Sequence, residues 1–165
     1  MKNIILIGMP GCGKSTFGRR LAQSCGLSFY DADAVLEERE QRTIKSFFAE
    51  SEEAFRLAET RTLEFLSQLE GAIIATGGGA VKRPVNMELL KANGTVIFID
   101  REPGNIIGCL NNDDRPLLSA DKERIFTLYE ERIELYRHYA DYTAANNGDF
   151  QATMATLKAL AKKEL

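Results

Sequence analysis

Residues 8–15 read Gly8-Met9-Pro10-Gly11-Cys12-Gly13-Lys14-Ser15, which is the spacing G-x-x-x-x-G-K-S. The apolar run Ile4-Ile5-Leu6-Ile7 comes directly before this stretch, and a helical pattern over residues 16–23 follows it. A strand, a glycine-rich loop and a helix in this order form a P-loop. Its glycines let successive backbone N–H groups turn inward as an anion nest, and the helix dipole favours the same negative charge. The stretch therefore predicts a site for the phosphates of a nucleoside triphosphate.

The side chains at the end of this loop predict how the phosphates are held. Lys14 supplies a cation for the β- and γ-phosphates, and the Ser15 hydroxyl is placed to bind Mg²⁺. The alternative is a glycine-rich turn that matches the motif by chance, which the strand before the loop and the helix after it disfavour. The expected ATP site also includes the neighbouring residues Gly11, Cys12, Gly13 and Thr16.

The chain has 165 residues, 44% of them hydrophobic, which is enough for one packed domain over residues 1–165. Its 21 basic and 24 acidic residues give a net charge of −3, which argues against general affinity for nucleic acid or anionic membranes. No apolar run approaches the ~18 residues of a membrane span, and the N-terminal residues do not resemble a signal peptide. We therefore expect a cytoplasmic monomer with small-molecule ligands and no nucleic-acid or membrane partner.

Short apolar runs alternate with helical patterns along the chain. This alternation implies βαβ units, and hence an α/β three-layer sandwich in which helices cover both faces of a parallel sheet. Ligands of such sheets bind at the carboxyl ends of the strands, so residues there are candidates for the site. The predicted strands are residues 4–7, 28–30, 72–75, 95–99 and, more weakly, 142–145. The predicted helices are residues 14–25, 34–67, 84–93, 103–110, 122–139 and 150–164.

Two carboxylates, Asp31 and Asp33, follow the second predicted strand. In an extended segment they would point the same way, where they could hold Mg²⁺ through water, accept a substrate hydroxyl, or do both. Asp33 could instead cap the helix that begins near Ala34. The run over residues 96–100 also looks like a Walker B strand that ends in a Mg²⁺ carboxylate, Asp100. The residues alone leave Asp31 and Asp100 as equal candidates for the metal.

Gly77-Gly78-Gly79 follows the third predicted strand. Three glycines contribute no side chain and cost chain entropy, which is tolerable where a ligand must approach backbone N–H groups closely. A plain tight turn is the alternative.

Arg56 lies in an acidic helical stretch, where it could form an i,i+3 ion pair with Glu53 or Glu59. Arg132 lies in another acidic helix and could equally be surface charge, so neither arginine is distinctive on its own.

Residues 111–116 (Asn-Asn-Asp-Asp-Arg-Pro) lack helical periodicity and are rich in turn formers. A mobile loop that carries one arginine is what a lid closing over phosphates requires. We therefore expect a mobile lid around residues 110–122, in which Arg115 reaches the phosphates.

In the helix that follows, Phe126, Tyr129 and Tyr136 fall at helical spacing and are expected to be core side chains.

In their order along the chain, these motifs resemble the shikimate kinase family of small P-loop kinases over nearly the whole length. A P-loop alone occurs in many families, but this combination is highly specific. One departure is that residues 108–114 contain no cation, whereas family members usually have an Arg or Lys in this part of the lid. The landmarks are residues 8–16 with Gly18-Arg19 and Leu21-Ala22, then Phe29-Tyr30-Asp31-Ala32-Asp33, Phe55-Arg56-Leu57-Ala58-Glu59, Ala75-Thr76-Gly77-Gly78-Gly79, Arg115-Pro116-Leu117-Leu118 and Arg132-Ile133-Glu134-Leu135-Tyr136.

The resemblance implies a five-stranded parallel sheet in the order 2-3-1-4-5 and the ATP-dependent phosphorylation of shikimate to shikimate 3-phosphate, with Mg²⁺ as cofactor. It implies that Lys14 and Arg115 neutralise the transferring phosphoryl group and that Asp33 takes the attacking hydroxyl, which makes these three residues catalytic. Ser15 would bind the metal directly and Asp31 through water, and Asp100 would not bind it.

The same resemblance implies a substrate-binding helical segment around residues 33–60. Arg56 and Arg132 would clamp the shikimate carboxylate, with Glu59 orienting Arg56. A small anionic polyol needs such a charge-assisted fork for its carboxylate and acceptors for its hydroxyls. The full set of expected substrate-binding residues is Asp33, Arg56, Gly78, Gly79 and Arg132.

Two other functions compete with this one. Another small-molecule P-loop kinase, for a sugar acid or a nucleoside monophosphate, could also use an arginine for an anionic acceptor, and a panel of substrates would separate these kinases. A regulatory GTPase or a non-catalytic nucleotide-binding module is the second alternative. The chain has no N-K-x-D guanine signature, and a lid arginine suits a kinase.

Overall fold

The computed structural model of this chain describes residues 1–110 and 119–165. Residues 111–118, with Arg115, lie outside the described residues and make up most of the lid predicted around residues 110–122. The five strands form one parallel sheet in the order β2-β3-β1-β4-β5, which confirms the order implied by the family resemblance. The strands are β1 (Asn3–Ile7), β2 (Ser28–Asp31), β3 (Ala72–Ala75), β4 (Gly94–Asp100) and β5 (Tyr142–Ala145).

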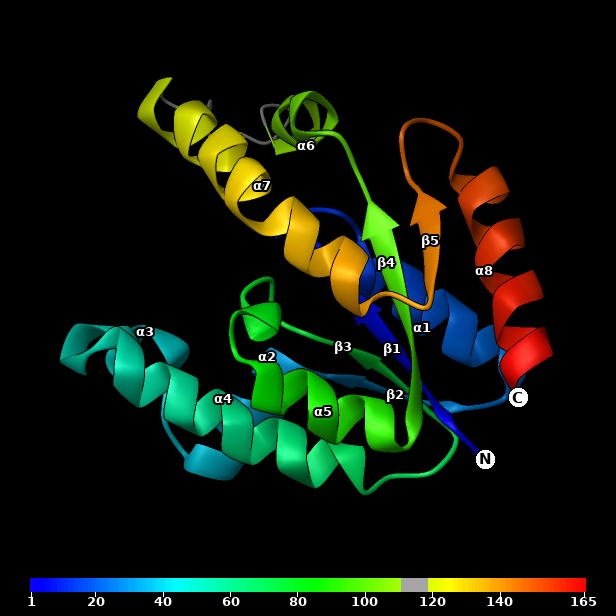
Figure 1. Cartoon of the computed structure of the whole chain (residues 1–165), viewed down its shortest axis with the longest axis horizontal. Helices are drawn as coiled ribbons and strands as arrows, with labels where there is room; N and C mark the ends of the chain where they lie inside the picture. The colour runs from blue at the N-terminus through cyan, green and yellow to red at the C-terminus, as the bar shows by residue number, and fades with distance from the viewer. Residues whose placement is uncertain (111–118) are drawn as a thin grey trace.

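Helices cover both faces of this sheet. Figure 1 shows α1 and α8 beside each other on one face, and α4, α5 and α7 on the other, and contacts between these elements agree with this layering. The three-layer sandwich expected from the sequence is therefore confirmed. The helices are α1 (Lys14–Cys25), α2 (Ala32–Glu40), α3 (Ile44–Glu50), α4 (Glu52–Ser67), the 3₁₀ turn η1 (Ala80–Lys82), α5 (Pro84–Ala92), α6 (Pro103–Leu110), α7 (Ser119–Tyr139) and α8 (Phe150–Glu164).

The central strand β1 is buried along its whole length, whereas the edge strands β2 and β5 are more exposed. A strand covered by helices on both faces is expected to be a continuous apolar run, which Ile4-Ile5-Leu6-Ile7 provides. Asn3 is a buried polar exception, and its side chain donates to Leu69 O at 2.7 Å and accepts from Ala72 N at 2.9 Å. These bonds fix the start of β1 against the start of β3. Because the two strands are parallel and in register, the loops that follow them meet at one edge of the sheet.

The prediction of one helix over residues 34–67 is wrong, because three helices fill this segment. Gln41 ends α2 in the left-handed region, with φ of 50°. The Thr43 hydroxyl then accepts the N–H of Ser46 at 3.1 Å and caps α3. The Ser51 hydroxyl accepts an N–H at 3.0 Å and caps α4. Both caps could be predicted from residue type, but helical spacing of apolar residues continues across the breaks and hides them.

The aromatic residues of α7 differ in burial. Tyr136 is completely buried and its ring stacks on Phe98 with 5.0 Å between centroids. Tyr129 is half-buried, and Phe126 is 47% exposed, so the prediction of a core side chain is wrong for Phe126. Within the described part of the chain, no helix combines the length and apolar character needed to span a membrane.

Candidate active site

The P-loop joins the central strand β1 to α1 and is shaped by glycine. Gly8, Gly11 and Gly13 have backbone φ angles of 149°, 79° and 104°, which residues with a Cβ atom rarely adopt. A Cβ at Gly13 would also lie 2.9 Å from the Phe17 ring. This backbone leads directly into the N-terminus of α1, so it has the conformation that the predicted anion nest requires.

Lys14 begins α1 and lies within the same loop. Its Nζ donates to Gly8 O at 2.7 Å and to Met9 O at 2.9 Å, and it lies 3.7 Å from Cys12 Sγ. Cys12 is completely buried, so its thiol fills space inside the loop. The loop carbonyls thus hold the Lys14 ammonium beside the anion nest, where it also lines the pocket described below.

Asp31 joins the P-loop to the next strand. The Ser15 hydroxyl donates to Asp31 Oδ2 at 2.7 Å, while Asp31 Oδ1 accepts the N–H groups of Asp33 at 3.0 Å and Ala34 at 3.3 Å. Asp31 therefore caps α2, the role considered for Asp33. The expectation that both aspartates lie in one extended segment is wrong, because α2 begins at Ala32, between them.

The oxygen atoms of Ser15 and Asp31 fit a magnesium ion. Both side chains face the phosphate pocket, and hard oxygen ligands are those that Mg²⁺ prefers. The described residues contain no group of three His, Cys, Asp or Glu side chains that could hold a metal by itself. Two protein ligands suit Mg²⁺, since it usually keeps several waters and binds substrate phosphates as well.

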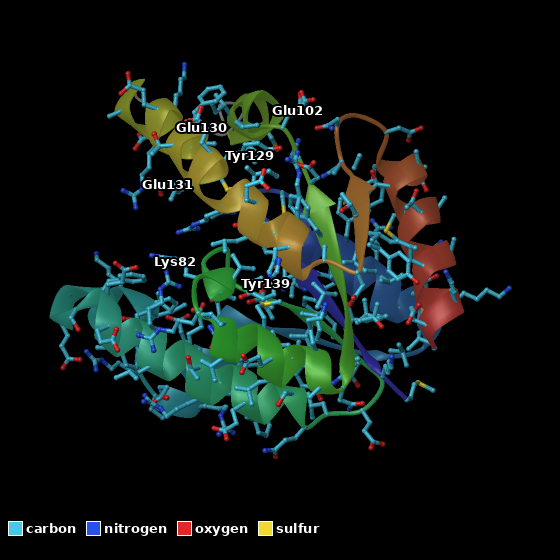
Figure 2. The ribbon with its side chains drawn as sticks, viewed as in Figure 1. Lys82, Glu102, Tyr129, Glu130, Glu131 and Tyr139 are labelled. Atoms are coloured by element: carbon cyan, nitrogen blue, oxygen red, sulfur yellow. The ribbon has the colours of Figure 1, made fainter. Side chains whose placement is uncertain are left out.

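Asp100, the other metal candidate, has a different environment. Its Oδ1 accepts a hydrogen bond from the Tyr129 hydroxyl at 3.1 Å, with Tyr129 on α7 (Figure 2). Asp100 is not among the described residues that line the phosphate pocket. The geometry therefore favours Asp31 over Asp100 as the metal-binding carboxylate.

Asp33, in the first turn of α2, is half-buried at the same pocket. Burial raises the pKa of its carboxyl, the nearby Asp31 raises this pKa further, and Lys14 opposes both effects. The Gly77 backbone packs against it, since a Cβ at Gly77 would lie 3.1 Å from Asp33 Oδ1. A carboxylate with a raised pKa is a stronger base, which suits a group that takes a hydroxyl proton.

Two hollows meet at Pro10. The phosphate pocket has a volume of about 460 Å³ and is lined by the P-loop, Asp31 and Asp33. A larger cleft of about 1040 Å³ lies between the α3–α4 region and α7, and is lined by Arg56 and Arg132; we call it the arginine cleft. Pro10 lines both, so a ligand in the arginine cleft can present a group to the P-loop.

Arg56 points from α4 into this cleft although it is only 8% exposed. Its Nη1 donates to Glu59 Oε1 at 2.9 Å, the i,i+3 ion pair considered from the sequence. Glu52 lies 3.5 Å from Arg56 Nε, which is buried without a hydrogen-bond partner among the described residues. Burial raises the pKa of Glu59 although the Arg56 guanidinium lowers it. Glu59 thus fixes the orientation of the guanidinium from behind.

The glycines after β3 let neighbouring groups approach the backbone closely. A Cβ at Gly78 would lie 2.7 Å from Pro10 Cδ, and one at Gly79 would lie 2.5 Å from Arg56 Nη2. The Arg56 guanidinium therefore packs directly on the Gly79 backbone. A plain tight turn does not explain these close contacts, because a side chain at Gly78 or at Gly79 would push the neighbouring group away.

Tyr136 is a site residue, although its helical spacing predicts only a core side chain. Its hydroxyl donates to Gly78 O at 2.6 Å, and Arg132 lies one turn earlier on α7. Burial raises the pKa of Tyr136 to about 12, against the opposing effect of Arg132. Tyr136 therefore connects α7, which carries the second arginine of the cleft, to the glycine turn, over a sequence separation that no local pattern reveals.

Two further cations at the site were not predicted. Lys82 on η1 lines the arginine cleft and pairs with Glu52 at 2.8 Å; Figure 2 shows it facing Glu131 of α7 across the gap between these elements. Arg101 lines the phosphate pocket and donates to Gly11 O at 3.1 Å. A signal for Arg101 did exist, because it directly follows the β4 strand end, where ligands bind.

A phosphate-binding loop and a separate cationic cleft at one edge of a parallel sheet are what an enzyme needs to bring an anionic acceptor to a nucleotide. The fold and the site together thus define a small-molecule kinase of the P-loop class.

Known proteins narrow this class further. Residues 10–161 match the family model described as shikimate kinase. A shikimate kinase of Clostridium botulinum is 43% identical over 159 residues, which are 96% of each chain. The structure of a shikimate kinase from Acinetobacter baumannii in complex with shikimate superposes with a TM-score of 0.83 at 33% identity, over 99% of this chain and 90% of that one. The chain belongs to the shikimate kinase family and is a kinase.

A gluconokinase from Sinorhizobium meliloti also superposes, with a TM-score of 0.63 over 99% of this chain and 95% of that one. Its identity to this chain is 17%, so the likeness concerns the fold alone. The rival sugar-acid kinases therefore share the architecture, and the difference between them and this chain must lie in the site.

Proposed function

We propose that the chain transfers the γ-phosphoryl group of ATP to the 3-hydroxyl of shikimate, acting as one kinase domain over residues 1–165. The observation that carries this proposal is that Arg56 and Arg132 line one cleft, and that this cleft adjoins the phosphate pocket at Pro10. A relative of the same fold whose structure contains shikimate supports the same acceptor.

The arginine cleft binds the carboxylate of the acceptor. Arg56 and Arg132 provide planar groups with several N–H donors, which suit a carboxylate better than a point charge does. Glu59 orients Arg56, and its burial keeps water from competing for that contact. The backbone N–H groups of Gly78 and Gly79 bind the acceptor beside the arginines.

The transfer itself needs positioning and charge neutralisation more than covalent chemistry. Asp33 takes the proton of the attacking hydroxyl, which its raised pKa favours. Lys14 neutralises the transferring phosphoryl group from the P-loop. Arg115, outside the described residues, is proposed as the second cation, and the lid around residues 110–122 stays a prediction from the sequence.

Mg²⁺ is the proposed cofactor, with Ser15 as a direct ligand and Asp31 as a ligand through water. When bound, the ion would offset the negative charge of the β- and γ-phosphates. The nucleotide further contacts the backbone of Gly11, Cys12, Gly13 and Thr16. We also propose that the protein is a cytoplasmic monomer whose ligands are ATP and shikimate, with no nucleic-acid or membrane partner.

Coupled ADP release with a panel of acceptors tests this function. ATP turnover should rise sharply when shikimate is added and stay at the basal level with gluconate or a nucleoside monophosphate. Arg132→Ala should lose most of the stimulation by shikimate at low shikimate concentration. Equal turnover with and without shikimate, or preference for another acceptor, would contradict the proposal.

A further inference from the structure

Arg101 is a cation of the phosphate pocket that the mechanism above does not use. It directly follows β4, so it projects from the carboxyl edge of the sheet, where the P-loop also lies. Its Nη1 donates to Gly11 O at 3.1 Å, and its side chain lines the pocket together with Lys14 and Ser15. A rigid strand end thus holds this guanidinium against the anion nest.

The charge of Arg101 is not balanced by the described part of the protein. Among the described residues it forms no ion pair, and its Nε is buried without a hydrogen-bond partner. The adjacent Asp100 instead accepts from Tyr129, and Glu102 lies exposed at the start of α6 (Figure 2). Arg101 is half-buried, and a buried Nε without an acceptor is costly, so this side chain calls for a ligand of opposite charge.

The sequence around Arg101 makes this cation more significant. Residues 102–114 contain no Lys or Arg, so Arg101 and Arg115 are the two cations between β4 and α7. Of these two cations, Arg101 lies within the described residues, and it lines the phosphate pocket. A triphosphate needs charge neutralisation along its whole length, and Lys14 and Arg101 are the cations among the described residues that line this pocket.

We propose that Arg101 is a further nucleotide-binding residue, an inference that rests on the proposed kinase function. One N–H of its planar guanidinium holds the Gly11 carbonyl, which fixes that peptide of the anion nest. The remaining N–H groups bind oxygen atoms of the β- and γ-phosphates of ATP. A guanidinium has five donors in a fixed plane, so it can hold a backbone carbonyl and a phosphate at the same time.

Isothermal titration with β,γ-imido-ATP and Mg²⁺, without any acceptor, tests this inference. Arg101→Ala and Arg101→Gln should each weaken binding by about 10-fold or more, the loss of a charge-assisted hydrogen bond. Arg101→Lys should recover part of the affinity. AMP, which lacks the β- and γ-phosphates, should bind all variants equally well. The matched control is Arg61→Ala. It removes an exposed arginine of α4 that pairs with Glu40 of α2 and does not line the phosphate pocket.

Two results would overturn the inference. Wild-type affinity in Arg101→Ala would show that the phosphates do not need this cation. Full recovery by Arg101→Gln, which keeps a donor for Gly11 and removes the charge, would make Arg101 a support of the loop alone. Thermal unfolding of each variant shows whether the fold is intact. Because this assay involves neither acceptor nor turnover, failure of shikimate-dependent turnover in the wild type would contradict only the proposed acceptor.

Discussion

Gly79 is the position where one methyl group tests the geometry of the arginine cleft. A Cβ added at Gly79 would lie 2.5 Å from Arg56 Nη2 and 2.6 Å from Nη1, and ordinary contacts begin at 3.4 Å. The difference between 3.4 and 2.5 Å requires the guanidinium to move by about 0.9 Å. Arg56 is 8% exposed and bonded to Glu59 at 2.9 Å, so this movement displaces it from the position that its partner fixes.

Gly79→Ala should therefore weaken the contact with the acceptor carboxylate while leaving the nucleotide site intact. Loss of a charge-assisted hydrogen bond costs about 1.5–3 kcal/mol, which corresponds to a rise of about 10- to 150-fold in the KM for shikimate. Coupled ADP release at saturating ATP measures it, and the KM for ATP should change little. Gly104→Ala is the matched control, because a Cβ at Gly104 meets open space.

A double-mutant cycle separates this clash from a general effect on the turn. In an Arg56→Ala, Glu59→Gln background, which removes the guanidinium and leaves no unpaired carboxylate, Gly79→Ala should have almost no further effect on shikimate binding. Neighbouring sites that act through one contact are non-additive in this way. A normal KM for shikimate in Gly79→Ala, or its full effect in the double-variant background, would refute the reasoning.

Three other predictions follow from the site. Asp33→Asn should abolish turnover yet raise the melting temperature at neutral pH. The pKa of Asp33 in the folded protein is raised above 3.8, so the wild type loses stability as the pH rises from about 4 through that pKa. Thermal unfolding between pH 4 and 8 should therefore show that the melting temperature of the variant exceeds that of the wild type by a margin that grows with pH. Asp31→Asn should raise the Mg²⁺ concentration needed for half-maximal rate and Asp100→Asn should not; the reverse result would assign the metal to β4. Tyr136→Phe, which removes the 2.6 Å hydrogen bond to Gly78 O, should raise the KM for shikimate by about 2- to 12-fold, and an unchanged KM would make Tyr136 a core residue only.

The parts of the fold that could be predicted from sequence are local. The P-loop is eight consecutive residues with a strand before it and a helix after it, so its conformation follows from nearby glycines and from the apolar run over residues 4–7. The helix over residues 34–67 was predicted as continuous because its breaks depend on a left-handed Gln41 and on two side-chain caps. Strand order came from the family resemblance, since parallel neighbours are distant in sequence.

The site divides in the same way. Asp33 and the three glycines pointed to a ligand by residue type, whereas the role of Arg56 came from the family resemblance. The structure brings Arg56, Asp33 and Gly78 to adjoining hollows. What these residues touch could not be predicted. The hydrogen bond from Tyr136 to Gly78 spans 58 positions and that from Arg101 to Gly11 spans 90, so each depends on how the layers pack.

We propose above all that the arginine cleft recognises the acceptor by its carboxylate, and shikimate methyl ester tests this recognition directly. The ester keeps the ring and hydroxyls of shikimate and removes only the negative charge. The kcat/KM of the wild type for the ester should be about 10- to 150-fold lower than for shikimate, the loss of one charge-assisted contact. In Arg132→Ala this difference should shrink. Equal use of the ester and the acid by the wild type would contradict the account.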